Sequence, residues 1–331
     1  MGMTATTAPA VAMSRSGQAN STGSSTALFL KVYAGEVLTA FEQASVTMDK
    51  HVIRSINSGI SAQFPMVWKT GTPDYAYINA ASGTPGTQTV ANELSGMHIN
   101  KAEKVISIDG LLIADHFVNN LDEAMNHYDV RSIYAKEAGI ALGTQWDKNV
   151  LQQGVKGARL ATPVLTGSNL GSVLTESTFA SSGTKLAEAM FDGAQKMDEN
   201  NVPENDRYMF VKPAKYYLMA ETTNVINRDW GGSGTYSEGS VLKVAGIHIV
   251  KTNNLPTTNI TTGADAHKDN FSTTVGLIMH KSAVATVKLL NLAVETEYDI
   301  KQQGWWIVAK YAMGHGYIRP EACIELRTAA P

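Results

Sequence analysis

One stretch of the chain constrains the fold more than any other, because it predicts a single helix of unusual length. Residues 120–153 contain no proline and repeat apolar residues at steps of three and four. The predicted apolar face consists of Leu121, Met125, Tyr128, Ala138, Leu142, Trp146 and Val150. We expect Asn119 or Asn120 to cap the start, and Gly154 and Gly157 to end the helix. At roughly 45 Å, such a helix suits a spine around which other elements are organised.

A second feature is a long two-stranded arm. Residues 62–69 and 103–108 are rich in strand-forming side chains, and they flank a polar segment that contains several glycines and prolines. A two-stranded ribbon is only marginally stable alone in water. We therefore expect this arm to lie on another structure, foremost on a neighbouring subunit. The alternative is an ordinary hairpin that packs on its own domain.

The N-terminal region divides into two parts. Residues 1–26 are mostly Ala, Ser, Thr and Gly with one charged side chain, Arg15. This segment cannot offset its own ordering entropy, so we expect it to be disordered or to be ordered only by a neighbour. Apolar spacing in residues 27–41 then predicts a short amphipathic helix. Residues 45–56 are more typical of a strand.

The rest of the chain mixes helices and strands without a regular βαβ repeat, which predicts an α+β fold. Residues 158–183 are rich in Thr, Ser and Gly and are expected to form a linker. Helices are predicted at 186–197 and from Pro213, where the first turn tolerates proline. Strands are predicted at residues 208–211, 247–250, 275–279, 284–290, 305–310 and 322–326.

Composition excludes several function classes. The formal net charge of the 331 residues is −3, whereas proteins that grip nucleic acid through phosphates are normally basic. The charged fraction is only 17%, which leaves more surface for burial against partners. The single cysteine, Cys323, allows no intrachain disulfide, which fits a reducing cytosol. The apolar run 111–114 is far too short for a membrane span, and we expect no signal peptide.

A search for catalytic chemistry finds no complete set of residues. His116 and His127, with Asp129 nearby, could suggest a metal site, but eleven positions along a helix place the two rings three turns apart. Asp109 and Asp115 are explained as well by turn or cap roles as by paired carboxylates. We therefore predict no catalytic, cofactor or metal site.

Two glycine-rich stretches and the cysteine also lack the partners that chemistry would need. Residues 314–316, Gly-His-Gly, lack the continuation of a phosphate loop, and a tight turn with positive φ is the expected role. Residues 231–234 likewise lack the continuation of a phosphate-binding loop. A buried structural thiol is the expected role of Cys323.

Six segments in the same order resemble the major capsid proteins of T7-like podoviruses. They span residues 27–41 (ALFLKVYAGEVLTAF), 61–65 (SAQFP), 103–112 (EKVISIDGLL), 122–132 (DEAMNHYDVRS), 279–289 (MHKSAVATVKL) and 309–322 (AKYAMGHGYIRPEA). Long matches over most of the chain make the resemblance specific. The sequence departs from the family in residues 1–26, around 70–100 and through much of 155–275.

The resemblance implies the HK97-type capsid fold, which is α+β. Residues 1–57 would form the N-terminal arm and residues 58–110 the extended loop. Residues 111–183 would form a peripheral domain that contains the long spine helix. Residues 184–290 would mainly form the axial domain, and residues 291–331 would return to the peripheral domain.

The resemblance also implies a function in self-assembly. The chain would form hexamers and pentamers of an icosahedral shell that encloses double-stranded DNA without sequence-specific binding. Its partners would be a scaffolding protein, a portal and, in some phages, decoration proteins. The shell would assemble as a procapsid in the host cytoplasm and would expand when DNA is packaged.

For contacts between subunits we single out six residues in or near the extended loop. Aromatic and arginine side chains dominate the energetics of interfaces. The six are Arg54, Phe64, Trp68, Lys69, Lys101 and Lys104. Phe64 and Trp68 are the expected apolar anchors, although Phe64 also suits a place in the core of its own subunit.

Three other functions remain as alternatives. The first keeps the fold but makes the chain an encapsulin-like compartment for protein cargo, against which the podovirus-like segments argue. The second is a soluble oligomeric enzyme of α+β fold, which the missing catalytic set disfavours. The third, a secreted adhesin, fits poorly without a signal peptide.

Overall fold

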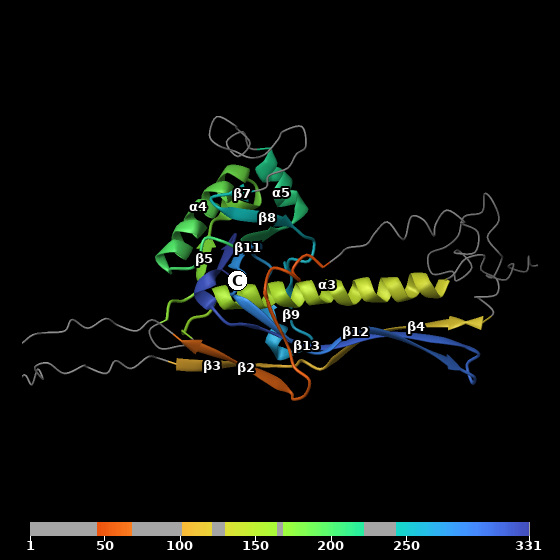
Figure 1. Ribbon diagram of the computed structural model, residues 1–331. Helices are drawn as coiled ribbons and strands as arrows, with labels where there is room; N and C mark the ends of the chain where they lie inside the picture. The colour runs from red at the N-terminus through yellow and green to blue at the C-terminus, as the bar shows by residue number, and fades with distance from the viewer. Residues whose placement is uncertain (1–44, 68–100, 121–129, 164–167, 222–242, 331) are drawn as a thin grey trace, which may run out of the picture.

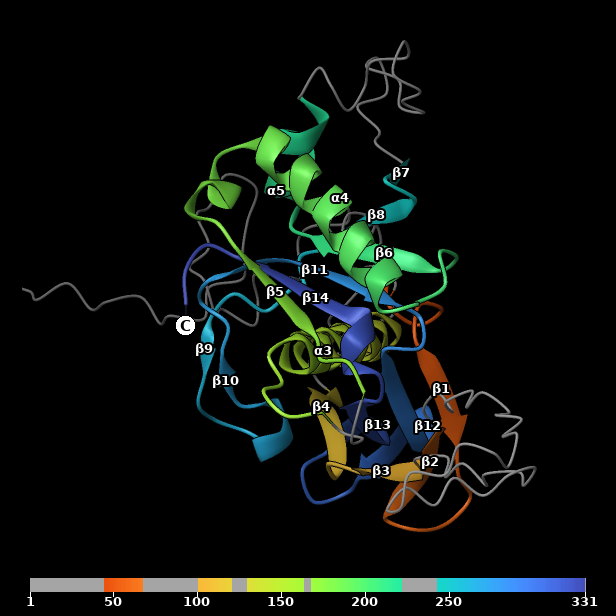
Figure 2. The ribbon, with the colours of Figure 1, turned by 90° about the vertical axis from the view of Figure 1, so that its left-hand side faces the viewer.

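The computed structural model describes residues 45–67, 101–120, 130–163, 168–221 and 243–330. Its shape is governed by one long helix that lies between two sheets (Figures 1 and 2). A compact upper layer carries two shorter helices, and a long, narrow sheet runs beneath the long helix (Figure 1). The predicted helix in residues 27–41 lies outside the described residues, as do residues 1–26.

The predicted spine is the helix α3 (Val130–Ala158), which has 29 residues and a length of roughly 43 Å. Its buried apolar side chains are Leu142, Trp146, Val150, Leu151 and Val155. At the predicted start, Asn119 ends a strand and Asn120 is helical, while residues 121–129 lie outside the described part.

The predicted end of the helix at Gly154 and Gly157 is wrong, because both glycines lie inside α3. A Cβ atom at Gly154 would lie 2.6 Å from Leu277 Cδ2, and one at Gly157 would lie 3.1 Å from Tyr317 Cβ. The missing side chains therefore allow the helix to approach the two sheets closely.

The lower layer is a four-stranded sheet of order β1-β12-β13-β4. Its strands are β1 (Val52–Ser55), β12 (Val284–Asp299), β13 (Gly304–Tyr317) and β4 (Leu111–Asn119). β1 runs parallel to β12, and the other pairs are antiparallel. Of the segment 45–56, predicted as strand, only β1 is extended, and the preceding residues form turns.

Residues 314–316 do not form the predicted turn with positive φ. They continue β13, and neither glycine has a positive φ. Their role is close packing, because a Cβ at Gly314 would collide with the backbone of Ser107. A Cβ at Gly316 would lie 2.9 Å from Ile106 Cγ1.

The upper layer is a six-stranded sheet of order β5-β14-β11-β6-β8-β7. Its strands are β5 (Ser172–Thr175), β14 (Cys323–Arg327), β11 (Thr274–His280), β6 (Arg207–Val211), β8 (Ile247–Lys251) and β7 (Lys243–Val244). The helices α4 (Gly183–Glu199) and α5 (Pro213–Ala220) accompany it, as predicted. Residues 158–183 are more than a linker, because β5 pairs with β14 in this sheet.

Small elements complete the fold. The ribbon β2 (Ser61–Val67) and β3 (Lys101–Ser107) is the described part of the predicted arm. The others are β9 (Asn259–Ile260), β10 (Asp269–Asn270), and the short 3-10 helices η2 (Ser177–Ala180), η4 (Asp265–His267) and η5 (Pro320–Ala322).

The two layers share one hydrophobic core, which runs along α3 and through both sheets. The expected domain division therefore stays a prediction, with two observations against its borders. The boundary at residue 290 falls inside the continuous strand β12. The six-stranded sheet takes β5 and β14 from outside residues 184–290.

A buried ion pair ties the end of α3 to the upper sheet. The Arg159 guanidinium donates to both carboxylate oxygens of Glu325, with Nε–Oε2 at 2.7 Å and Nη2–Oε1 at 2.6 Å. The same guanidinium donates to Asn270 O at 2.7 Å, and Thr274 Oγ1 donates to Glu325 at 2.7 Å. The Glu325 side chain is fully buried, so each lone pair without a donor would be costly.

We expect Glu325→Ala to lower the free energy of unfolding by about 2–4 kcal/mol, because it removes both short hydrogen bonds of the Arg159 guanidinium to a carboxylate and leaves Asp269, at 3.4 Å, as its ion-pair partner. Urea unfolding of the unassembled subunit measures this loss. Glu188→Ala is the matched control, since Glu188 pairs with Lys185 at an exposed site on α4. Equal, small effects of the two substitutions would contradict the assignment.

Candidate functional site

Two segments distant in the sequence meet on the central part of α3, namely the turn of residues 45–51 and the connection of residues 254–267. Asp109, which follows β3, joins this region through His267. They bring together the parts of the chain that the resemblance assigns to the arm, the extended loop, the spine and the axial domain. This junction is the candidate functional region of the subunit.

Asp147 is the centre of the junction. Its carboxylate is fully buried and accepts hydrogen bonds from Ser45 Oγ at 2.5 Å and from Thr47 Oγ1 at 2.5 Å. The backbone amides of Val46 and Thr47 donate at 2.9 and 3.2 Å, and Asn254 Nδ2 donates at 3.1 Å. Five donors satisfy a charge that would otherwise be expensive to bury. They fix the turn before β1 onto the spine helix.

A chain of hydrogen bonds continues from this turn into the lower sheet. His51 Nδ1 lies 2.7 Å from Thr47 O, and His51 Nε2 lies 2.9 Å from Thr286 Oγ1. Thr286 Oγ1 also lies 2.9 Å from His315 Nδ1. Burial lowers the pKa of His51 to about 4, against the pull of Asp147 in the opposite direction. Burial, and then the nearby His267 and His51, lowers the pKa of His315.

The base of the arm packs on its own subunit. β2 and β3 pair in register from Ser61–Ser107 to Val67–Lys101. The inner face of this ribbon contributes Ala62, Phe64 and Ile106, which pack with Ala285 and Val287 of β12 in a second core. The alternative of a hairpin on its own domain therefore describes the base. The loop beyond Val67 lies outside the described residues.

Of the six predicted contact residues, four are described and lie near one another. Arg54 Nη1 donates to Gln63 O at 2.7 Å, and its guanidinium lies 5.7 Å from the Phe64 ring centre. Lys104 Nζ lies 4.2 Å from the ring centre of Tyr317, and Lys101 is exposed. Phe64 is buried within its own subunit, so it holds the ribbon on β12. Trp68 and Lys69 lie outside the described residues.

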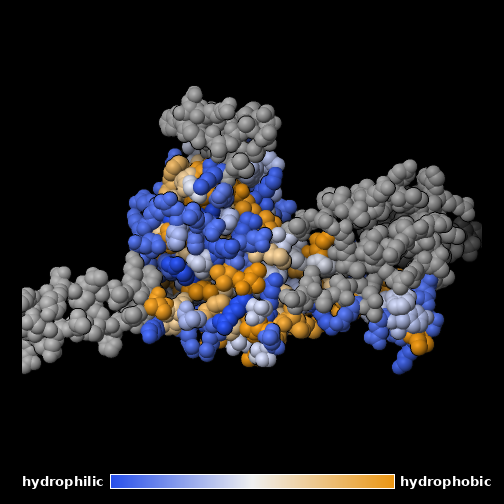
Figure 3. Space-filling view, viewed as in Figure 1, coloured by the Kyte–Doolittle hydropathy of each residue, from blue (hydrophilic) through white to orange (hydrophobic). Residues whose placement is uncertain are grey.

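The outer surface of the ribbon and of the neighbouring edge strand carries exposed apolar side chains. Val67 is 63% exposed and Val105 is 45% exposed, on the ribbon face opposite Phe64. On β4, the first three residues are also exposed, and these are Leu111, Leu112 and Ile113. On the face in Figure 3, hydrophobic residues gather across the middle of the described body. Exposed apolar patches of this kind are typical of surfaces that bind other proteins.

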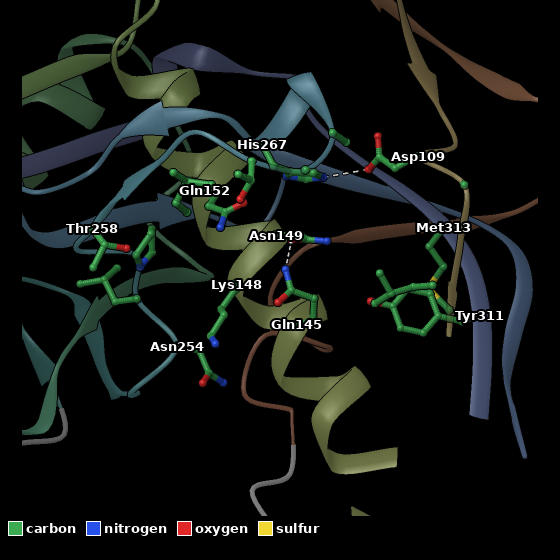
Figure 4. A pocket seen from close by; sticks show the side chains of 18 of the residues that line it. Asp109, Gln145, Lys148, Asn149, Gln152, Asn254, Thr258, His267, Tyr311 and Met313 are labelled. Atoms are coloured by element: carbon green, nitrogen blue, oxygen red, sulfur yellow. Dashed lines mark hydrogen bonds and ion pairs between the residues drawn. The ribbon is translucent and has the colours of Figure 1, made fainter. Parts of the chain in front are cut away.

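A cavity of about 560 Å³ opens beside α3 (Figure 4). Its helix side is lined by Gln145, Lys148, Asn149 and Gln152. Asp109 lies across from them and accepts from His267 Nε2 at 2.8 Å. The predicted turn or cap role of Asp109 therefore misses this pairing. The residues that line the cavity include no serine or cysteine, but they include Thr257, Thr258 and Thr262.

Metal and thiol chemistry find no site among the residues that the structure describes. No group of three His, Cys, Asp or Glu side chains there is arranged to hold a metal ion. His116 lies on β4, so the helical spacing assumed for it is wrong, and His127 is outside the described part. Cys323 is buried as expected, and burial raises its pKa. None of the described helices has the length and hydropathy to cross a membrane.

Sequence reasoning missed the junction residues. Asp147 follows Trp146 and lies one turn before Val150, so a charged residue on the apolar face of the predicted helix was the available signal. The partners of Asp147 are about a hundred positions away, and no local pattern marks them.

We expect Asp147→Asn to loosen the turn of residues 45–51, because the new amide group would face donors where the carboxylate accepts. The free energy of unfolding should fall by about 1–3 kcal/mol, and limited proteolysis should cut ahead of β1 sooner. Asp192→Asn on α4 is the matched control, since Asp192 is exposed. Proteolysis rates that match the control would argue against the anchoring role of Asp147.

Comparisons with known proteins identify the family. The family profile described as "Gp10A-like: Major capsid protein" matches residues 78–327. The chain is 35% identical to the major capsid protein of Escherichia phage T7, with 91% of each protein covered. It is 34% identical to that of Enterobacteria phage T3, with 92% of this chain and 93% of the relative covered.

Solved structures of phage capsids are also similar to this chain. The capsid of cyanophage P-SCSP1u has a TM-score of 0.77 and 42% sequence identity, over 92% of this chain and 94% of that chain. The mature capsid of bacteriophage PhiM1, at 17% identity, shares the fold with a TM-score of 0.70 over 88% and 89%. The chain therefore belongs to the Gp10A-like family of phage major capsid proteins and has the HK97-type fold.

Proposed function

We propose that this protein builds the icosahedral shell of a tailed phage as hexamers and pentamers of one chain. The observation that carries the proposal is the similarity to the T7 major capsid protein along 91% of both chains. The long sheet and spine, which span most of the subunit, supply a rigid plate from which such a shell can be tiled (Figure 1).

Contacts between subunits in this proposal use the ribbon β2–β3 and the loop that it carries. Ring-forming contacts are heterologous, so one patch meets a different patch on the next subunit. The exposed apolar side chains Val67 and Val105 would be covered in such contacts. Arg54, Lys101 and Lys104, with Trp68 and Lys69 beyond them, would supply charged and aromatic contacts. Many weak contacts then add up through multivalency in a closed lattice.

The partners of assembly follow from the same proposal. A scaffolding protein would guide a procapsid, a portal would occupy one vertex, and decoration proteins would be optional. The shell would enclose double-stranded DNA in the virion after assembly in the host cytoplasm. A net charge of −3 supports a container that confines DNA without binding it tightly. Expansion would shift the arm, the loop and the spine while the shared core stays packed.

The alternatives have less support. A virus-like particle from Pyrococcus furiosus has a TM-score of 0.50 at 15% identity, which is a likeness of fold alone. An encapsulin-like compartment is thus weaker than a phage shell, for which identities reach 42%. We propose that the protein acts without catalysis, because membership of a capsid family supplies a structural role.

A variant without the loop that the ribbon β2–β3 carries tests the role of this loop in assembly. Val67 and Lys101 are directly paired, so an Asn-Gly turn can replace residues 68–100 and leave the ribbon base on its core. We expect a folded subunit with a normal melting temperature that forms no closed shells. Electron microscopy after co-expression with the phage scaffolding protein measures this, with the full-length chain as control. Normal closed particles from the shortened chain would refute the role of the loop.

A further inference from the structure

The histidine chain of the junction fastens three elements together within one subunit. His51 ends the turn that Asp147 holds, while Thr286 and His315 lie on β12 and β13. Both histidine rings also lie against Trp146 of α3, with ring centres 6.0 Å apart in each case. His51 and His315 are 2% and 4% exposed, so water has little access to either ring.

The partners determine the direction of each hydrogen bond in this chain. A carbonyl oxygen only accepts, so His51 Nδ1 donates to Thr47 O, and His51 Nε2 carries the lone pair. The Thr286 hydroxyl therefore donates to His51 and accepts from His315 Nδ1. This assignment leaves the lone pair on His315 Nε2, and that atom is buried without a partner among the described residues.

The hydrogen bonds of His51, Thr286 and His315 leave no satisfied position for an additional proton. Protonated His51 would place its Nε2–H against the Thr286 hydroxyl, which already accepts from His315. The hydroxyl proton would then need a new acceptor. If His315 changed tautomer to provide one, its Nε2–H would be buried without an acceptor. Each arrangement combines a buried charge with an unpaired donor, and both are costly.

We propose that the His51–Thr286–His315 hydrogen bonds form an acid-sensitive contact whose loss releases the turn of residues 45–51 from the lower sheet. Its loss would leave the start of the described chain attached through Asp147 alone, while the two sheets stay packed. The proposal concerns contacts within one subunit, so it does not depend on shell formation.

The charged groups around His51 and His315 include some that favour protonation of a histidine and others that oppose it. Asp147 faces His51 and favours its protonated form, whereas Lys288 and Lys281 oppose it. Lys288 Nζ lies over the Trp146 ring at 4.4 Å. His267 faces His315 at 6.0 Å between ring centres and is itself paired with Asp109. Burial outweighs the attraction of Asp147 and lowers the pKa of His51 to about 4, while burial and the nearby His267 and His51 lower the pKa of His315.

The sign of the pH dependence follows from the lowered pKa of both histidines. A released histidine takes up a proton near its ordinary pKa of 6.5, whereas His51 in the intact contact does so only near pKa 4. The contact is therefore strongest above about pH 6.5 and weakens as the pH falls toward 4. A shift from 6.5 to about 4 allows the opening equilibrium to rise by up to about 300-fold from His51 alone.

Hydrogen exchange on the full-length protein tests the proposal. Exchange of peptides that cover residues 45–53 is measured from pH 7.5 to 4.5 and corrected for the intrinsic rate at each pH. We expect the opening equilibrium to increase on the order of 100-fold, while peptides of the central strand β6 keep their protection. A flat pH response in the wild type would overturn the proposal, as would simultaneous loss of protection in β6.

Substitutions distinguish a pH response caused by the two histidines from one caused by the nearby carboxylates. In the double variant H51Q/H315N, the amides retain hydrogen-bonding groups but do not titrate, so the pH response should fall at least tenfold. Asp147 is intact there, and an unchanged response would assign the effect to it and overturn the proposal. His248→Gln at an exposed site of β8 is the control and should respond as the wild type. If the double variant does not fold, H51Q alone is tested for the same loss.

Discussion

The subunit depends on the burial of α3 between two sheets that the chain builds from distant segments. Neither sheet could cover its apolar face without the helix, and the helix could not hide its own apolar stripe without both sheets. The glycines at positions 154 and 157 bring the three layers into contact, because they remove side chains at the points of closest approach. The shared core makes the spine the element through which the two parts of the subunit are coupled.

Polar anchors supplement this apolar core at two places along the spine. Asp147 holds the turn before β1, and Arg159 holds Glu325 of the upper sheet just beyond the end of the helix. Each anchor is a buried charge with several hydrogen bonds, which fixes geometry because a misplaced partner leaves the charge unsatisfied. The turn before β1 and the upper sheet are therefore positioned relative to the same long helix.

This arrangement suits a subunit that must form a shell. A rigid plate with its own core can present a ribbon to its neighbours without unfolding, and the ribbon base at Phe64 secures that projection. On the outer face of the ribbon, Val67 and Val105 are exposed. The hydrogen bonds of His51, Thr286 and His315 add a contact between the turn before β1 and the lower sheet, and we propose that acid weakens it.

Local sequence patterns were enough to predict several helices and strands. The long helix, α4, α5 and the strands around residues 208–211, 247–250 and 275–279 follow from periodicity and from turn and cap residues. The ribbon base followed from two strand-like segments around a polar loop. The ordered matches along most of the chain indicated the capsid family and, through it, the fold.

The roles of single residues inside these elements depend instead on long-range packing. Gly154, Gly157 and Gly314 looked like helix ends and a turn, but close approach of distant backbones decided their role. Asp147, His51 and His315 acquired partners from segments that are far apart in the sequence. Local patterns record the preference of a residue for helix, strand or turn. Which side chains meet across a core depends on how the layers pack, and that packing is a property of the whole chain.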